Sequence, residues 1–345
     1  MNNRICAGML SVGQATKLSQ VDLKRKYDLV LGGLSWERRT TSAFCATKQL
    51  DAEIKLLKFS SRDADTDKRK NENLELLKKT FKCDVVDLSR SVAFSENVEK
   101  IERFIEDQYV ATSRPLSVLL DITCVPKSYI LFLLGLGFSK DFFTRLDCLY
   151  AEGAYSLDSL QQDDPAFGST GRAIMSDGAW ESVQIPYLES AATIPADRDL
   201  LVAMGGEVGL SLPFIEKYEP SRLGLVLISE SLVQTPDQLP DSERQALAEL
   251  LAEPNVTRFD VPLCDVAGLA DRAIQFCKNS KAESVSGVAI GSKTHALALG
   301  IAALSEDNME VICRVPRAYK PLDVAATGQI SFYEIEDRFD PSAYL

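Results

Sequence analysis

The stretch LSVLLDITCVPKSYILFLLGLGF, at residues 116–138, decides the fold. Its first seven residues form a near-continuous apolar run, which is typical of a strand buried on both faces of a parallel sheet. A polar turn follows at residues 121–128, and the apolar run YILFLLGLGF occupies residues 129–138. A membrane span needs about 20 apolar residues, so this shorter run predicts a buried helix. The stretch therefore predicts one buried β-α unit.

The same alternation of strands and helices extends in both directions from this unit. Before residue 151 we expect strands at 27–31, 53–59, 84–88, 116–122 and 145–150, and helices at 41–50, 71–81, 97–110 and 129–136. After residue 198 we expect strands at 200–204, 223–228, 256–261, 285–290 and 309–315, and helices at 212–218, 242–252, 266–278 and 294–304. A last strand at 330–335 is expected to lie antiparallel on a sheet edge. The charge run at 62–70 is expected to be a solvated loop.

Strands that alternate with helices indicate parallel sheets with right-handed crossovers. The predicted fold class is therefore α/β, with two Rossmann-like β/α units of mainly parallel strands joined by an irregular insert. We expect an N-terminal domain at 1–150, the insert or linker at 151–198, and a C-terminal domain at 199–345. A length of 345 residues also favours two domains. Within the insert, glycine and proline interrupt the alternation, but its aromatic residues favour an ordered segment, such as a hairpin covering a cleft.

Composition excludes several classes of function. With 50 Asp+Glu against 38 Lys+Arg the net charge is −12, so sequence-independent DNA binding is not expected. The eight cysteines form no C-x-x-C pair and no secretory signal is apparent, so we expect a cytoplasmic chain with reduced thiols and no zinc site. The single histidine, His295, excludes a site that needs two histidines, and no G-x-S-x-G elbow supplies a catalytic serine.

Candidate ligand-binding residues follow four of the predicted strands. In open α/β sheets ligands bind beyond the carboxyl ends of strands, where the free N–H groups of helix N-termini attract anions. The turn after the first strand contains Gly32, Gly33, Ser35, Glu37, Arg38 and Arg39. The turn after the most buried strand contains Asp121, Thr123 and Lys127. In the second half the corresponding turns contain Gly205, Gly206 and Glu207, and Gly291, Ser292, Lys293 and His295.

Each turn also has a purely structural interpretation. Glycines shape turns, Asp121 can accept hydrogen bonds from turn N–H groups, and His295 can be packed or solvated. The correspondence between the halves is more informative, because each has a Gly-Gly turn after its first strand and a hydroxyl-plus-lysine turn after a late buried strand. Two such units that face each other would share a cleft across a pseudo-twofold axis.

In that cleft the expected ligand is a small phosphorylated molecule such as a nucleotide. Cations would neutralise its phosphates, namely Arg38, Arg39, Lys127 and Lys293. Hydroxyl groups would donate hydrogen bonds, namely those of Ser35, Thr123 and Ser292. Carboxylates would orient these groups or accept from ribose hydroxyls, namely those of Glu37, Asp121 and Glu207. The sequence names no cofactor and no metal site.

The segment Asp121-Ile122-Thr123-Cys124-Val125-Pro126-Lys127 resembles the strand-end D-x-T-x-x-x-K turn of CARF domains. These are Rossmann-like sensors of CRISPR-associated effectors, in which this turn lines a cyclic-oligonucleotide site. The glycines usual between Thr and Lys are replaced here. The tandem arrangement is similar to the SAVED domain, a fusion of two CARF-like units. The resemblance implies a prokaryotic defence role, as a stand-alone sensor, a ligand-degrading enzyme or a subunit of a defence complex.

Two other functions stay open at this point. A nucleotide hydrolase or transferase would use Glu37, Glu207 or Asp121 as acid or base, with His295 or Lys293 stabilising an anion. A non-catalytic interaction subunit would carry a vestigial cleft. Besides the small ligand, the expected partners are an effector protein or a second copy of the chain, and no membrane.

Overall fold

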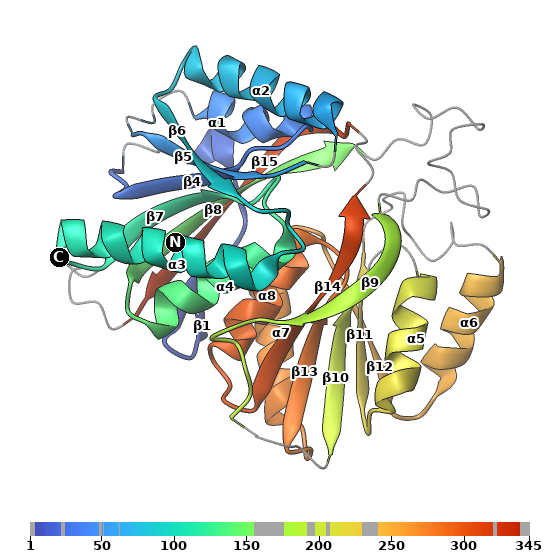
Figure 1. The fold of residues 1–345 in the computed structure, drawn as a ribbon. Helices are drawn as coiled ribbons and strands as arrows, with labels where there is room; N and C mark the ends of the chain where they lie inside the picture. The colour runs from blue at the N-terminus through green and yellow to red at the C-terminus, as the bar shows by residue number, and fades with distance from the viewer. Residues whose placement is uncertain are drawn as a thin grey trace.

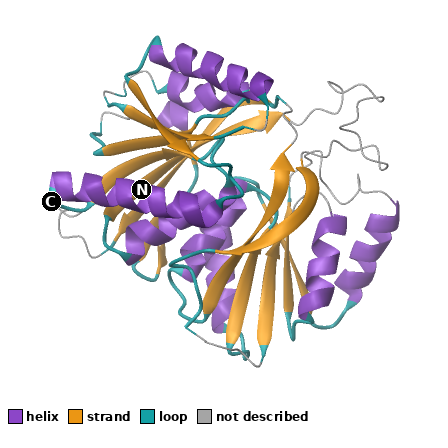
Figure 2. Ribbon diagram, viewed as in Figure 1, coloured by secondary structure: helices purple, strands orange, loops and turns teal. Residues whose placement is uncertain are grey.

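The computed structural model describes residues 4–21, 25–47, 50, 52–61, 63–154, 176–191, 197–204, 208–229, 241–319 and 323–338. Within them the chain forms two units, each with a mixed sheet that contains five adjacent parallel strands and has helices on both faces (Figures 1 and 2). This arrangement confirms the predicted α/β fold class. No helix in the described residues is long and apolar enough to span a membrane.

The first sheet has the order β1-β2-β15-β8-β7-β4-β5-β6, and a short strand, β3, also pairs with β15. Its strands are β1 (Arg4–Ala7), β2 (Leu10–Gly13), β3 (Thr16–Lys17), β4 (Leu29–Gly33), β5 (Ile54–Phe59), β6 (Cys83–Leu88), β7 (Leu116–Asp121), β8 (Phe143–Ala154) and β15 (Ala325–Asp337). The helices of this half are η1 (Leu18–Gln20), η2 (Arg38–Thr41), α1 (Ser42–Ala46), α2 (Ala64–Lys78), α3 (Phe94–Thr112) and α4 (Lys127–Ser139).

The second sheet has the order β12-β11-β10-β13-β14-β9. Its strands are β9 (Ser176–Gln184), β10 (Arg198–Ala203), β11 (Leu223–Ile228), β12 (Val256–Val261), β13 (Ser284–Ala289) and β14 (Met309–Tyr319). The helices are α5 (Val208–Tyr218), α6 (Asp241–Ala252), α7 (Val266–Lys278) and α8 (Lys293–Ala303). The parallel strands β8-β7-β4-β5-β6 and β14-β13-β10-β11-β12 have the same order in the two halves, so the halves are topological equivalents.

The two halves exchange their antiparallel strands. β9 follows β8 in the chain but pairs with β14, whereas β15 follows β14 but pairs with β8. The prediction of an edge position for the last strand is therefore wrong, because β15 lies inside the first sheet between β2 and β8. Likewise, residues 176–184 of the expected insert are a strand of the second sheet, and most of that insert, residues 155–175 and 192–196, lies outside the described residues.

Two more local expectations are corrected. The charge run is not a loop, because α2 begins at Ala64, and the Asp63 side chain caps the helix by accepting from the Thr66 N–H at 2.7 Å. Acidic residues in a first turn are favourable at the positive end of a helix. At the N-terminus, strands β1 and β2 form an antiparallel pair in a segment where we expected no strand.

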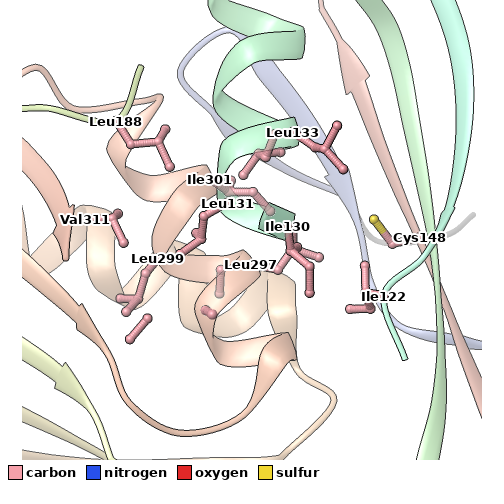
Figure 3. Packing of buried hydrophobic residues seen from close by; sticks show 14 of the residues in the cluster. Ile122, Ile130, Leu131, Leu133, Cys148, Leu188, Leu297, Leu299, Ile301 and Val311 are labelled. Atoms are coloured by element: carbon pink, nitrogen blue, oxygen red, sulfur yellow. The ribbon is translucent and has the colours of Figure 1, made fainter. Parts of the chain in front are cut away.

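Helices α4 and α8 pack against each other at the centre of the molecule, and every residue from Ser128 to Phe138 of α4 is buried. Figure 3 shows Ile130 and Leu131 of α4 beside Leu297 of α8. A Cβ atom at Gly300 of α8 would lie 2.7 Å from Cδ2 of Leu134, so glycine permits this close approach. The predicted buried helix is thus confirmed, and its surroundings come from both halves.

Because both halves share this core, we expect a single substitution in the core to destabilise both halves together. Leu134→Ala should lower the free energy of unfolding by about 2–5 kcal/mol, the cost of lost apolar burial plus a cavity. Urea denaturation followed by circular dichroism measures this change in the free energy of unfolding. The control is Leu76→Ala on α2, where the side chain is 49% exposed and the expected change is within about 0.5 kcal/mol. Two separate transitions, with only one shifted, would contradict the shared core.

Candidate anion site where the two sheets meet

The carboxyl ends of the parallel strands of both sheets converge where α4 and α8 begin (Figure 1). The first residue of α4 is Lys127 and the first residue of α8 is Lys293. Nζ of Lys127 donates to the backbone carbonyls of Ile290 and, at 2.9 Å, Gly291 in the second half. Nζ of Lys293 donates in return to the backbone carbonyl of Thr123 in the first half. The two lysines thus cross the junction reciprocally.

Neither lysine has an acidic partner at ion-pair distance among the described residues, and both side chains belong to partly exposed residues. Burial lowers the pKa of Lys127 to about 8, and the neighbouring charge of Lys293 lowers it further. Burial also lowers the pKa of Lys293. An ammonium group has three N–H donors, and the carbonyls use two on Lys127 and one on Lys293. Donors therefore remain for an anion.

The turn after β4 holds a fixed carboxylate beside this junction. Oε2 of Glu37 accepts from Nε of Arg39 at 2.9 Å and from Nη2 of Arg39 at 2.7 Å. Arg39 is 3% exposed, and its Nη1 also donates to the backbone carbonyl of Ala151. Arg38 points elsewhere, because its side chain is 87% exposed and pairs with Asp323 at 3.3 Å. The structure thus brings Glu37 and Arg39 together and leaves Arg38 at the periphery.

Buried polar residues of α2 hold this turn and its neighbour, and sequence reasoning missed them. Nδ2 of Asn73 donates to the carbonyls of Ser35, at 2.9 Å, and Glu37, at 3.2 Å. Nζ of Lys70 donates to Oγ of Ser61 at 2.6 Å, at the end of β5. The surrounding run of charged residues gives no sign that Lys70 and Asn73 are buried. Only the pairing of α2 with these turns reveals it.

The turn after β7 is tied to its own backbone. Asp121 is 2% exposed, and its Oδ1 accepts from the Thr123 N–H at 2.9 Å. Oγ1 of Thr123 accepts from the Ala151 N–H at 2.9 Å. Burial raises the pKa of Asp121 to about 6, partly offset by its hydrogen bonds and by the charges of Lys293 and Arg39. The contacts of Asp121 therefore agree with its structural interpretation, in which the carboxylate accepts a hydrogen bond from an N–H group of the turn.

Close packing surrounds the glycines of two predicted turns. A Cβ atom at Gly33 would lie 2.7 Å from the backbone of Cys124, and one at Gly32 would lie 2.7 Å from the ring of Phe44. A Cβ atom at Gly291 would lie 2.3 Å from the Met204 carbonyl oxygen. These glycines let the turns pass one another at the carboxyl edge. The remaining glycine pair, Gly205 and Gly206, lies outside the described residues with Glu207.

The hydroxyl and imidazole groups of the last turn serve α8 and the core. Oγ of Ser292 accepts from the His295 N–H at 3.1 Å, which caps the helix. His295 is fully buried, with Nε2 3.1 Å from the Pro262 carbonyl oxygen. Ser35 is also buried, at the start of the turn that Asn73 holds. Of this last turn, Lys293 and Gly291 are the residues that contribute to the junction.

Asp121 gives the stability of the chain a predictable pH dependence. Its folded-state pKa of about 6 is above the ordinary 3.8, so stability falls as the pH rises through this interval and the charged form is a cost at pH 7. Asp121→Asn should raise the free energy of unfolding at pH 7 by about 3 kcal/mol and leave it unchanged near pH 3.5. Denaturation at both pH values tests this, with Asp87→Asn on the exposed side of β6 as control. A wild type more stable than Asp121→Asn at pH 7 would contradict it.

No protein-family model matches the sequence, and no curated protein matches it. Among solved structures, the cytoplasmic domain of a prokaryotic cation chloride cotransporter is 10% identical, with a TM-score of 0.25 over 84% of this chain and 95% of that one. A universal stress protein from Archaeoglobus fulgidus is 13% identical, with a TM-score of 0.22 over 83% of this chain and 96% of that one. At this level neither similarity assigns a ligand to the chain.

Proposed function

We propose that the chain binds a nucleotide or cyclic oligonucleotide by its phosphate groups where the carboxyl edges of the two sheets meet. The observation that carries the proposal is the reciprocal pair Lys127 and Lys293, two cations at one junction without a carboxylate partner in the described residues. Withdrawing a cation from water is costly unless it is paired. A bound phosphate would offset that cost for both lysines.

The backbone at the same place favours an anion as well. Lys127 and Lys293 are the first residues of α4 and α8, and the positive end of each helix dipole lies at the junction. The D-x-T-x-x-x-K turn, with Asp121, Thr123 and Lys127, also lies there. This position supports a sensor of the CARF/SAVED kind within a prokaryotic defence system.

The contacts suggest a different role in ligand binding for each of these residues. Lys127 and Lys293 would bind phosphate, and Arg39 would hold Glu37 in place. Gly205, Gly206 and Glu207 stay in the proposal as the corresponding turn of the second half. A nucleotide-processing enzyme that uses His295 gains no support, because that ring lies in the core against Pro262.

Calorimetric titration of the full chain tests this function. The ligands are adenosine and guanosine mono-, di- and triphosphates and cyclic di-, tri- and tetranucleotides. We expect at least one to bind, and Lys127→Met/Lys293→Met to weaken its binding at least about tenfold, because both phosphate-binding charges are lost.

Lys100→Met is the matched control, since this lysine lies on the exposed side of α3 and pairs with Glu96. Its affinity should equal that of the wild type. No heat and no thermal shift with any ligand would refute the function. Unchanged binding by the folded double variant would place the ligand elsewhere.

A further inference from the structure

The second sheet ends at β12, which pairs with β11 on one side and with no other strand in the described part of the chain. The carbonyls of Asn255 and Val261 accept from N–H groups at either end of β11, at 2.9 and 3.0 Å. Because backbone groups alternate in direction along a strand, the odd-numbered residues between them also face β11, whereas Arg258 and Asp260 face outward. This edge therefore offers backbone donors and acceptors to a further strand.

The side chains of β12 differ between its two faces. On one face, Nε of Arg258 donates to Oδ2 of Asp260 at 2.9 Å, and both side chains are 47% exposed. On the other face, Phe259 packs edge-on against Phe276 of α7, with ring centroids 6.1 Å apart, and stays partly exposed. The edge thus carries opposite charges on one face and an aromatic ring on the other.

A second copy of the chain complements this edge. A twofold axis at Phe259 makes two copies of β12 antiparallel and places Arg258 opposite Asp260 of the second copy. The four charges then form a square in which each lies beside the opposite sign, and the two Phe259 rings meet at the axis. Cross-strand pairs of both kinds are stabilising. An axis at Arg258 would instead place two arginines directly opposite each other, which is destabilising.

The surroundings of the edge leave room for this pairing. Nη1 of Arg272 donates to the Asp260 carbonyl at 3.0 Å, but Arg272 is exposed and a carbonyl oxygen can accept a second hydrogen bond. The equivalent edge of the first sheet is β6, and its exposed side chains, Asp84 and Asp87, are both acidic. Two copies of β6 would bring like charges together. Of these two equivalent edges, β12 is the one that is complementary to itself.

We infer that the chain forms a twofold dimer by antiparallel pairing of β12 with β12 of a second copy, with the axis at Phe259 and Arg258 opposite Asp260. The second sheets of the two copies then form one continuous sheet across the axis. The dimer does not depend on the proposed ligand, since neither Lys127 nor Lys293 takes part in the pairing.

Analytical ultracentrifugation of the full chain over a range of concentrations tests the dimer. The wild type should reach twice the mass of one chain, and Arg258→Asp and Asp260→Arg should each weaken self-association at least about tenfold, because both cross-strand charge pairs become repulsive. An equimolar mixture of these two variants should associate again, since an acidic edge then faces a basic one. A role in folding alone cannot produce that rescue. Asp87→Arg on β6 is the matched control and should leave the dimer unchanged.

Cysteine cross-linking tests the register. Under mild oxidation Phe259→Cys should join two copies, because its two thiols face each other across the axis at a distance that a disulfide spans. Thr257→Cys should not, because residue 257 lies opposite Val261 of the second copy. The wild type, with its own eight cysteines, gives the background.

The cross-link needs neither charge reversal, so it decides the register even where one of those variants fails to fold. A wild type that stays monomeric at every concentration would overturn the inference, and so would a dimer that forms equally well in both charge-reversal variants. Cross-linking of Thr257→Cys in place of Phe259→Cys would overturn the register. Each of these results leaves the proposed nucleotide function as it stands.

Discussion

The packing of α4 on α8 is the constraint on which the rest of the molecule depends. Both helices are buried along nearly their whole length, and their side chains belong to one apolar cluster that includes residues of both sheets. A helix that is apolar on every side has no stable position at a surface, so each half needs the other to cover it. The same packing places the first residues of the two helices, Lys127 and Lys293, against each other's strand ends.

The exchanged strand β15 adds contacts within the first sheet, away from the packing of α4 on α8. β15 is joined to β8 by backbone pairing, and also by ion pairs of Arg145 with Glu334 and Glu336. Buried Asp147 accepts from the Tyr27 hydroxyl at 2.7 Å and pairs with Arg145 at 2.8 Å on the same face of the sheet. Charge pairing between segments far apart in sequence thus reinforces the pairing of β15 with β8 inside the first sheet.

Much of the fold could be predicted from the sequence because β-α alternation is a local property. The strands at 116–121 and 223–228 and the helix at 266–278 follow directly from apolar runs and periodicity. The partners of β9 and β15 could not be predicted, since strand pairing joins residues far apart in the chain. The N-terminal strands, of four residues each, are too short for periodicity to identify.

The same distinction applies to the site. Lys127 and Lys293 could be identified from their positions after buried strands, but their meeting depends on how two helices pack. The pairing of Glu37 with Arg39 spans only two residues and could be considered from sequence. The contribution of Asn73 could not, because nothing local distinguishes a buried asparagine from an exposed one within a polar helix.

The packing of α4 on α8 also limits how binding of the proposed ligand could be signalled to a partner. To swing apart as two rigid bodies, the halves would have to break the hydrogen bonds that Lys127 and Lys293 make across the junction and expose the apolar surface of α4 and α8 to water. Hinge opening of that kind costs far more than the coupling energy typical of ligand-driven switches. If the proposed ligand binds, its presence would therefore be signalled through the turns at the sheet edge, by a change in the surface that they present.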